Sequence, residues 1–343
     1  MGLRQITRIA AAALAVALPL AMPAQHLSAK EGPELEAQFD TMLGSEARVP
    51  RTYQAIYKNA LAQRIAEVAE GSQGRIGVAA IDLTTGEKVS VLGDQRFPMA
   101  STSKIAIAAT FLEGVERGRW SLNQSFPMLM PVGSRPFSSA VAPVREGNRL
   151  PAIDLIEQMI TRSNNYATDA LLRVVGGPKE VTAWVRRAGI KQFQIDRDIA
   201  TLVRDDGEFN PANHIDLRDS ATPNAMVELL AGLYQGKWLK PESRRILIGA
   251  MGRTITGKRR MRYLLPDNAR VMHKTGSLNN TSSDVGLVET PDGRTLAIAV
   301  YVTGQGTRPA REAKIAAISR ALYDGYLAQG PRREWAGAGY GSK

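Results

Sequence analysis

The sequence predicts an α/β fold combined with an all-α part, in which both chain ends build one antiparallel sheet with flanking helices, around an inserted helical lobe. Two observations support this prediction. Strand-like runs with hairpin turns lie near both ends of the chain, at 76–92 and 284–302, and helical apolar spacing dominates the middle. A length of 343 residues with 44% apolar content allows one domain with a substantial core.

The first predicted elements are a helix and a hairpin. Residues 53–70 have apolar side chains at helical spacing and end before a glycine. Residues 76–83 and 88–92 have strand character and flank the turn sequence Thr84-Thr85-Gly86. Helices of the middle lobe are expected near 101–116, 152–160, 165–175, 180–188 and 224–234.

The last elements return to strands and end in a helix. Residues 284–289 and 295–302 flank Pro291-Asp292-Gly293, a strong hairpin signal, and 310–327 has one apolar helical face. We therefore expect a domain at 53–330, with an α/β part at 53–95 and 241–330 and a helical part at 96–240. A signal peptide at 1–24, an N-terminal lead at 25–52 and a disordered tail at 331–343 complete the expected organisation.

The N-terminal residues are typical of an export signal. Arg4 and Arg8 precede the apolar run 9–20, which is too short to span a bilayer comfortably. The chain has no cysteine, so neither a disulfide nor a lipid-modified cysteine is available. These features predict a periplasmic or secreted protein without a membrane partner after cleavage of the signal.

The charge pattern argues against a nucleic-acid partner. The formal charge is +11, and removal of Arg4 and Arg8 would leave 11 − 2 = +9, but the basic residues are scattered. The densest run, 258–262, has no interleaved aromatic residue, so nucleic acid is not an expected partner. The chain has three histidines and no H-E-x-x-H or G-x-S-x-G motif, so we expect no metal, no cofactor and no Ser-His-Asp triad. We also expect a monomer.

The first motif with chemical content is Ser101-Thr102-Ser103-Lys104, just before the apolar run 105–112. A serine at a helix start lies near unpaired backbone N–H groups, which favour developing negative charge. Lys104 follows three residues later on the same helical face, where an amine of lowered pKa can activate a hydroxyl. The alternative is a helix cap followed by a solvated lysine.

The second and third motifs are Ser163-Asn164-Asn165 and Lys274-Thr275-Gly276-Ser277. The second forms a turn between two buried helical runs, where Ser163 is either part of a site or simply a helix N-cap. The third ends a strand-like run, where Gly276 allows close approach of another backbone or a ligand and Lys274 supplies a positive charge. Its alternative is an ordinary edge strand.

In this order, the three motifs resemble those of class A β-lactamases and, more widely, β-lactamase-like serine hydrolases of the penicillin-binding protein superfamily. The resemblance extends over about 53–327 and includes Asp219 to Pro223 and the Thr256-Gly257 segment with Arg260. It implies a β-lactamase-like fold and a serine hydrolase that acts on the cyclic amide of β-lactam antibiotics. Small β-lactams or cell-wall peptides are the implied substrates.

The resemblance also implies a role for each matching residue. Ser101 would be the nucleophile, Lys104 its base and Ser163 the proton shuttle to the leaving nitrogen. The backbone N–H groups of Ser101 and Ser277 would form the oxyanion hole. The implied substrate-binding residues are Asn165, Lys274, Thr275, Gly276, Ser277 and Arg260. Arg197 and Asp219 would close a loop by a salt bridge.

The loop is where the chain departs from the family pattern Arg-x-Glu-x-x-Leu-Asn. Alignment of Arg197 and Leu202 puts Ile199 at the position of the glutamate that activates water for deacylation. The deacylation base is therefore unknown; Asp198 is a weak candidate, and Asp205, Asp206 and Glu208 are others. Three outcomes remain open, namely a β-lactamase with slow deacylation, a penicillin-binding or muropeptide-binding protein that stalls after acylation, and a D,D-peptidase-like cell-wall hydrolase.

Overall fold

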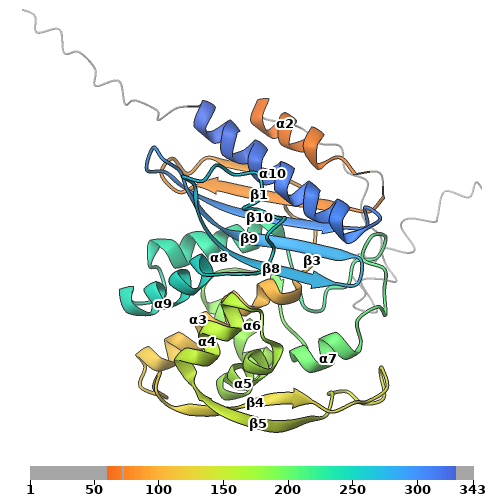
Figure 1. Cartoon of the computed structure of the whole chain (residues 1–343), viewed down its shortest axis with the longest axis vertical. Helices are drawn as coiled ribbons and strands as arrows, with labels where there is room; N and C mark the ends of the chain where they lie inside the picture. The colour runs from red at the N-terminus through yellow and green to blue at the C-terminus, as the bar shows by residue number, and fades with distance from the viewer. Residues whose placement is uncertain (1–59, 72, 330–343) are drawn as a thin grey trace, which may run out of the picture. The chain divides into compact units, whose positions relative to one another are not determined.

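A five-stranded antiparallel sheet combines strands from both ends of the chain (Figure 1). The computed structural model describes residues 60–71 and 73–329. The strand order is β2-β1-β10-β9-β8, with β1 at Ile76–Asp82, β2 at Lys88–Val91, β8 at Arg270–Leu278, β9 at Thr281–Glu289 and β10 at Thr295–Thr303. The predicted fold class is confirmed, and β8, which carries the third motif, is an edge strand.

Both faces of the sheet are covered, which explains the continuous apolar sequence of β10. Leu296, Ile298 and Val300 belong to the core under α2 (Ala60–Ala69) and α10 (Arg308–Ala328). The intervening Ala297 and Ala299 belong to the second core, on the side of the middle helices. Side chains of a strand alternate between faces, so burial of both faces requires an apolar residue at nearly every position.

The helical part packs against one face of the sheet and shares the second core with it (Figure 1). Its elements are the 3-10 turn η1 (Ala100–Ser103), α3 (Lys104–Glu116), α4 (Ala152–Thr161), α5 (Asn165–Val175), α6 (Pro178–Arg187), α7 (Ile199–Arg204), α8 (Pro223–Gln235) and α9 (Pro241–Gly252). Helix α8 packs on β1 and β10, and α9 packs on β8. Helix α3 contacts α4, α5, α6 and α9, so it is the central helix of this part.

Several elements differ from the sequence prediction. The helix expected from 101 begins as η1, and α9 was not expected at all. The hairpin of β4 (Ser125–Pro131) and β5 (Val144–Pro151) was also missed, because β5 is largely exposed and polar and has no alternating pattern. Strands β3 (Phe97–Pro98), β6 (Phe193–Gln194) and β7 (Ser220–Ala221) are two residues each, too short to leave a periodic signal.

Some expectations fall outside the described part of the chain, namely the signal peptide, the lead, residues 53–59 of the first helix and the tail. Within 60–71 and 73–329, no helix has the length and apolar character that crossing a membrane requires.

Candidate active site

Ser101 lies in the turn η1, which leads directly into the buried helix α3. Thr102 and Ser103 use their hydroxyls within the turn, donating to the carbonyls of Met99 and Ala100 at 2.8 Å each. The Ser101 side chain is half-buried, and within the described residues its hydroxyl has no hydrogen-bond partner. Ser101 is thus the hydroxyl of this turn that remains available to a ligand.

Lys104 is fully buried at the start of α3. Its Nζ donates to Asn165 Oδ1 at 2.7 Å, to the Ser163 carbonyl at 2.8 Å and to Ser163 Oγ at 3.2 Å. Burial lowers the pKa of Lys104 well below its usual value, and the charge of Lys274 lowers it further, while Asp169 opposes the shift. Burial therefore favours the neutral form of the amine, which can accept a proton, and its hydrogen-bond partners belong to the second motif rather than to Ser101.

Ser163 joins the first and third motifs. Its Oγ lies 3.2 Å from Lys104 Nζ and 3.0 Å from Lys274 Nζ, so an amine contacts the hydroxyl from each of two elements. Ser163 has a backbone φ of +60° in the turn between α4 and α5, which is uncommon for residues other than glycine. The N-cap of α5 is Asn164, which accepts bonds from two backbone N–H groups, so the alternative reading of Ser163 as an N-cap is wrong.

Gly276 brings the third motif against the turn that carries Ser101. A Cβ at this position would lie 2.7 Å from the Met99 carbonyl, 3.0 Å from Ala100 Cβ and 2.5 Å from Ser283 Oγ. No larger residue fits without moving β8 away from η1. The prediction that a glycine here permits close approach of another backbone is confirmed.

Lys274 and Thr275 lie beside this contact on β8. Lys274 is fully buried, and its Nζ donates to the Thr275 carbonyl at 2.9 Å as well as to Ser163. Burial lowers the pKa of Lys274 to about 7, with Asp284 opposing the shift and Arg260 adding to it. The Thr275 hydroxyl lies 2.7 Å from the hydroxyl of Thr256. A second buried amine therefore lies across the Ser163 hydroxyl from Lys104.

Arg260 differs from its expected role as a direct substrate ligand. It is 1% exposed, and its guanidinium donates to the carbonyls of Gly276 and Ser283 at 2.8 and 2.9 Å and to Ser277 Oγ at 2.7 Å. Its Nε and Nη2 atoms each donate to Glu312 Oε1, at 3.2 and 3.1 Å. All five N–H donors are thus used within the protein. In this structure Arg260 holds the β8 backbone behind the site.

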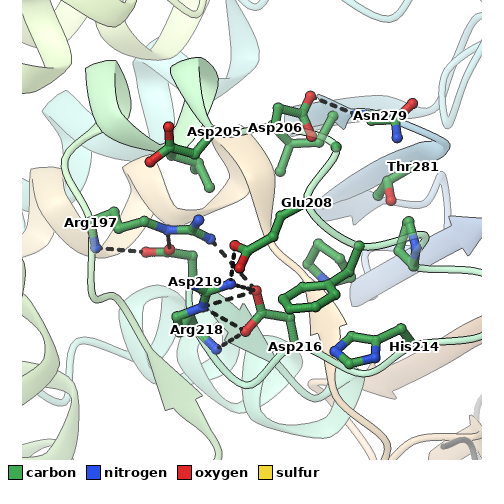
Figure 2. Close-up of a pocket in the computed structure, with 16 residues that line it drawn as sticks. Arg197, Asp205, Asp206, Glu208, His214, Asp216, Arg218, Asp219, Asn279 and Thr281 are labelled. Carbon is green, nitrogen blue, oxygen red and sulfur yellow. Dashed lines mark hydrogen bonds and ion pairs between the residues drawn. The ribbon is translucent and has the colours of Figure 1, made fainter. Parts of the chain in front are cut away.

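The loop from Arg197 to Asp219 is closed by the expected ion pair. Arg197 Nε donates to Asp219 Oδ2 at 2.6 Å, and Asp219 Oδ1 accepts the backbone N–H groups of Asp196 and Arg197. Figure 2 shows this pair at one side of a small pocket, with Arg218 bonded to Asp216. On the far side of the pocket, Asp206 accepts the Asn279 N–H at 2.7 Å, which ties the loop to the β8–β9 turn.

The acidic candidates for activating water are all engaged elsewhere. Asp198 is the N-cap of α7, with its Oδ1 accepting from Thr201 N at 2.7 Å. Asp205 pairs with Arg204 and Glu208 with Arg218, while Asp206 holds Asn279 as described. Ile199 is 4% exposed and lines a pocket with Asn165 and Asp169.

Asp169 is the carboxylate that sequence reasoning missed. It lies on α5 one turn after Asn165, is 4% exposed, and interacts electrostatically with Lys104. The sequence could have indicated it, because Asp169 follows Asn165 by four residues, so both side chains lie on one face of a helix that begins in the second motif.

A separate buried pair lies within the sheet beside Lys274, where His273 Nδ1 is 2.8 Å from Asp284 Oδ1. Across residues 60–71 and 73–329, no group of three potential metal ligands occurs.

A profile described as "Beta-lactamase enzyme family" matches residues 60–326 of the chain. Among curated proteins, β-lactamase OXY-2 of Klebsiella oxytoca is 30% identical over 260 residues, which cover 75% of this chain and 84% of that protein. β-Lactamase CTX-M-6 of Salmonella typhimurium is 31% identical over 248 residues, covering 71% of this chain and 81% of that one.

Solved structures give the same result. A β-lactamase from Chitinophaga pinensis superposes with a TM-score of 0.69 at 30% identity, covering 78% of this chain and all of that chain (100%). An ancestral class A β-lactamase (GNCA), named for the last common ancestor of Gram-negative bacteria, gives 0.67 at 33% identity, covering 77% and 99%.

Proposed function

The chain belongs to the β-lactamase enzyme family, and we propose that it is a class A-like serine β-lactamase that opens the β-lactam amide through an acyl-enzyme on Ser101. One observation carries this proposal. The Ser163 hydroxyl lies within hydrogen-bonding distance of both Lys104 and Lys274, so the three motifs meet at one place. Three motifs that meet in space as well as in order argue against three unrelated surface features.

In the proposed acylation step, Ser101 Oγ attacks the β-lactam carbonyl and Lys104 accepts the hydroxyl proton. The C–N bond of the ring breaks as the Ser163 hydroxyl gives its proton to the leaving nitrogen and regains one from an adjacent amine. The lowered pKa of Lys104 and its bond to Ser163 Oγ support this route, because burial favours the neutral, proton-accepting form of the amine and the amine already contacts the shuttle.

Substrate recognition is assigned to the walls of the site. The backbone N–H groups of Ser101 and Ser277 form the oxyanion hole, which the tight Gly276 contact between η1 and β8 supports. Asn165 Nδ2 binds the side-chain amide, and Lys274 with Thr275 binds the carboxylate. Arg260 acts one layer behind them, because its donors hold the Gly276 carbonyl and the Ser277 hydroxyl.

Deacylation is the step in which this chain departs from its family. Ile199 carries no proton-accepting group, and this observation favours a second candidate, a penicillin-binding or muropeptide-binding protein that keeps its acyl group, or a D,D-peptidase-like hydrolase. The number of turnovers per enzyme separates them. Many turnovers with a β-lactam support the first function, and a single burst supports the second.

The remaining parts of the proposal concern the chain outside the site. We place the protein in the periplasm or medium after removal of residues 1–24, as a monomer with a small-molecule substrate and no membrane or nucleic-acid partner. The domain is assigned to 53–330, with the α/β part at 53–95 and 241–330. Fractionation of expressing cells, with N-terminal sequencing of the exported form, tests the localisation.

Ser101→Ala tests the proposed function with a chromogenic cephalosporin as substrate. We expect hydrolysis to fall at least about 1,000-fold, because the serine and lysine act as one unit in nucleophilic catalysis. Ser103→Ala is the matched control, since it removes a neighbouring hydroxyl that is bonded only to the Ala100 carbonyl. Native activity in Ser101→Ala, with both proteins folded, contradicts the proposal.

A further inference from the structure

Asp169 lines a pocket together with Asn165 and interacts electrostatically with Lys104. The pocket has a volume of about 320 Å³ and is shared by Asn165, Asp169, Ile199 and Ala200. Asn165 connects it to the site, because its Oδ1 accepts the 2.7 Å bond from Lys104. A carboxylate therefore lies one helical turn from a residue that directly contacts the proposed base of acylation.

The Asp169 carboxylate is held in place but not saturated. Oδ1 accepts the Ile199 N–H at 2.7 Å and Oδ2 accepts the Ala200 N–H at 2.9 Å. These two bonds fix the carboxylate against the first turn of α7. A carboxylate has about four acceptor positions, so each oxygen retains a lone pair for a further donor.

One residue that lines the same pocket, Ser134, has a buried hydroxyl without a hydrogen-bond partner among the described residues. A buried hydroxyl, a carboxylate with free lone pairs and sufficient volume are the requirements for an ordered water. The apolar Ile199 supplies a wall and no competing acceptor.

We infer that Asp169 is the base that activates water for hydrolysis of the Ser101 acyl-enzyme, a step that rests on the function proposed above. Water oxygen attacks the ester carbonyl, and its proton passes to the Asp169 carboxylate. The bond from the carbonyl carbon to Ser101 Oγ then breaks, and the proton held by Asp169 passes to the serine oxygen through the Lys104 amine, which is neutral again once it has reprotonated Ser163. The carboxylic acid product leaves, and Ser101, Asp169 and Lys104 return to the protonation states in which the cycle began.

The charges around Asp169 agree with this role. Burial raises the pKa of Asp169 to about 7, and Asp198 adds to the rise, while the two N–H bonds and Lys104 oppose it. Arg204 also lines the pocket, but its guanidinium is bonded to Asp205 and Ser139. A base must be ionised, so the deacylation rate should rise with pH through about 7 and level off above it.

Asp169→Asn tests the inference in a quenched reaction with the chromogenic cephalosporin. We expect the burst of one equivalent and the Ser101 adduct to remain, because no acylation step transfers a proton to or from Asp169, and loss of its charge only lowers the pKa of Lys104 further. The adduct should decay about 100-fold more slowly or more, and the rise with pH should disappear. In Asp169→Ala, added formate should restore part of the decay rate by supplying a carboxylate to the pocket.

The possible results are distinguishable. Unchanged decay in Asp169→Asn, or slow decay with the wild-type pH profile and no response to formate, overturns the inference and leaves the proposed function standing. Trapping of the adduct by Asp198→Asn instead of Asp169→Asn also overturns it, since asparagine keeps the α7 cap and removes only the charge. Absence of any Ser101 adduct in the wild type overturns both proposals.

Discussion

Three of the seven non-glycine residues with positive φ in the described part of the chain lie at the site or where its loop closes. Ala100, Ser163 and Asp219 have φ of +49°, +60° and +49°, a region that residues other than glycine rarely adopt. Ala100 precedes the proposed nucleophile, Ser163 links the two lysines, and Asp219 closes the loop. Such conformations persist when surrounding contacts over-determine them, and they concentrate at functional sites.

Ile199→Glu should raise turnover by placing a carboxylate in the pocket shared with Asp169. Two nearby carboxylates disfavour ionisation of both, so the gain should be larger in the Asp169→Asn background, where the new group is alone. Steady-state hydrolysis of the chromogenic cephalosporin measures the effect. Val203→Glu is the comparison variant, because Val203 also lines this pocket but is 51% exposed, so its carboxylate would lie toward solvent rather than in the buried position of Ile199.

Turnover that stays unchanged in Ile199→Glu, in both backgrounds, counts against the alignment of the loop. An equal gain in Val203→Glu shows that any added negative charge near the pocket is sufficient. Either result removes the reason for regarding Ile199 as the residue that distinguishes this chain from its family.

The individual residues differ in how far the sequence predicted them. Ser101, Lys104, Ser163 and Lys274 were found from motif order, because their spacing survives without knowledge of the fold. The hydrogen bonds that connect these residues to one another were not predicted from the sequence. The bonds of Lys104 to Ser163 and Asn165 span 59 and 61 positions, and no local pattern encodes them.

At the scale of elements, the loop between Arg197 and Asp219 depends on one buried ion pair. Asp219 is 4% exposed, and burial raises its pKa even though Arg197 opposes the shift. Removal of a single partner leaves a buried charge without compensation, which costs about 3–5 kcal/mol, whereas an exposed pair contributes less than about 1 kcal/mol. The loop should therefore be far more sensitive to this pair than to surface pairs.

Arg197→Ala should lower the melting temperature by about 6 °C or more at pH 7, since each kcal/mol shifts it by about 2–4 °C in a domain of this size. The loss should shrink toward pH 5, because the unpaired Asp219 then takes up a proton and no longer buries a charge. Arg245→Ala is the control, as its pair with Glu242 is 73% and 71% exposed. Equal losses in both variants, or a larger loss at pH 5, would show that the pair does not hold the loop.

The elements themselves were predictable where the apolar pattern is clear. Helix α5 has apolar side chains at helical spacing, and β1 and β10 are apolar runs; these elements and β2 lie within two residues of their expected ranges. Hairpin β4–β5 was missed because β5 is largely exposed, β4 is half-buried and neither has an alternating pattern. Short helix α7 was missed because its six residues are positioned by Asp169 and the Asp198 cap rather than by an amphipathic face.

For the whole molecule, the sheet and the helical part meet where η1 packs against β8. The sequence predicted both parts, since strand signals lie at the ends of the chain and helical signals in between. Their contact follows from the Gly276 backbone against Met99 and Ala100, a pairing of segments about 175 positions apart that only the folded chain reveals. The site is thus a property of the assembled fold, and no single segment contains it.

Peptide mapping by mass spectrometry of the acid-quenched reaction with a β-lactam shows directly whether Ser101 forms the acyl-enzyme. Within the first turnover, we expect one added β-lactam mass per chain, on the peptide that contains Ser101, and no adduct in Ser101→Ala. Hydrolysis with no adduct, or with the adduct on a different residue, would rule out Ser101 as the nucleophile.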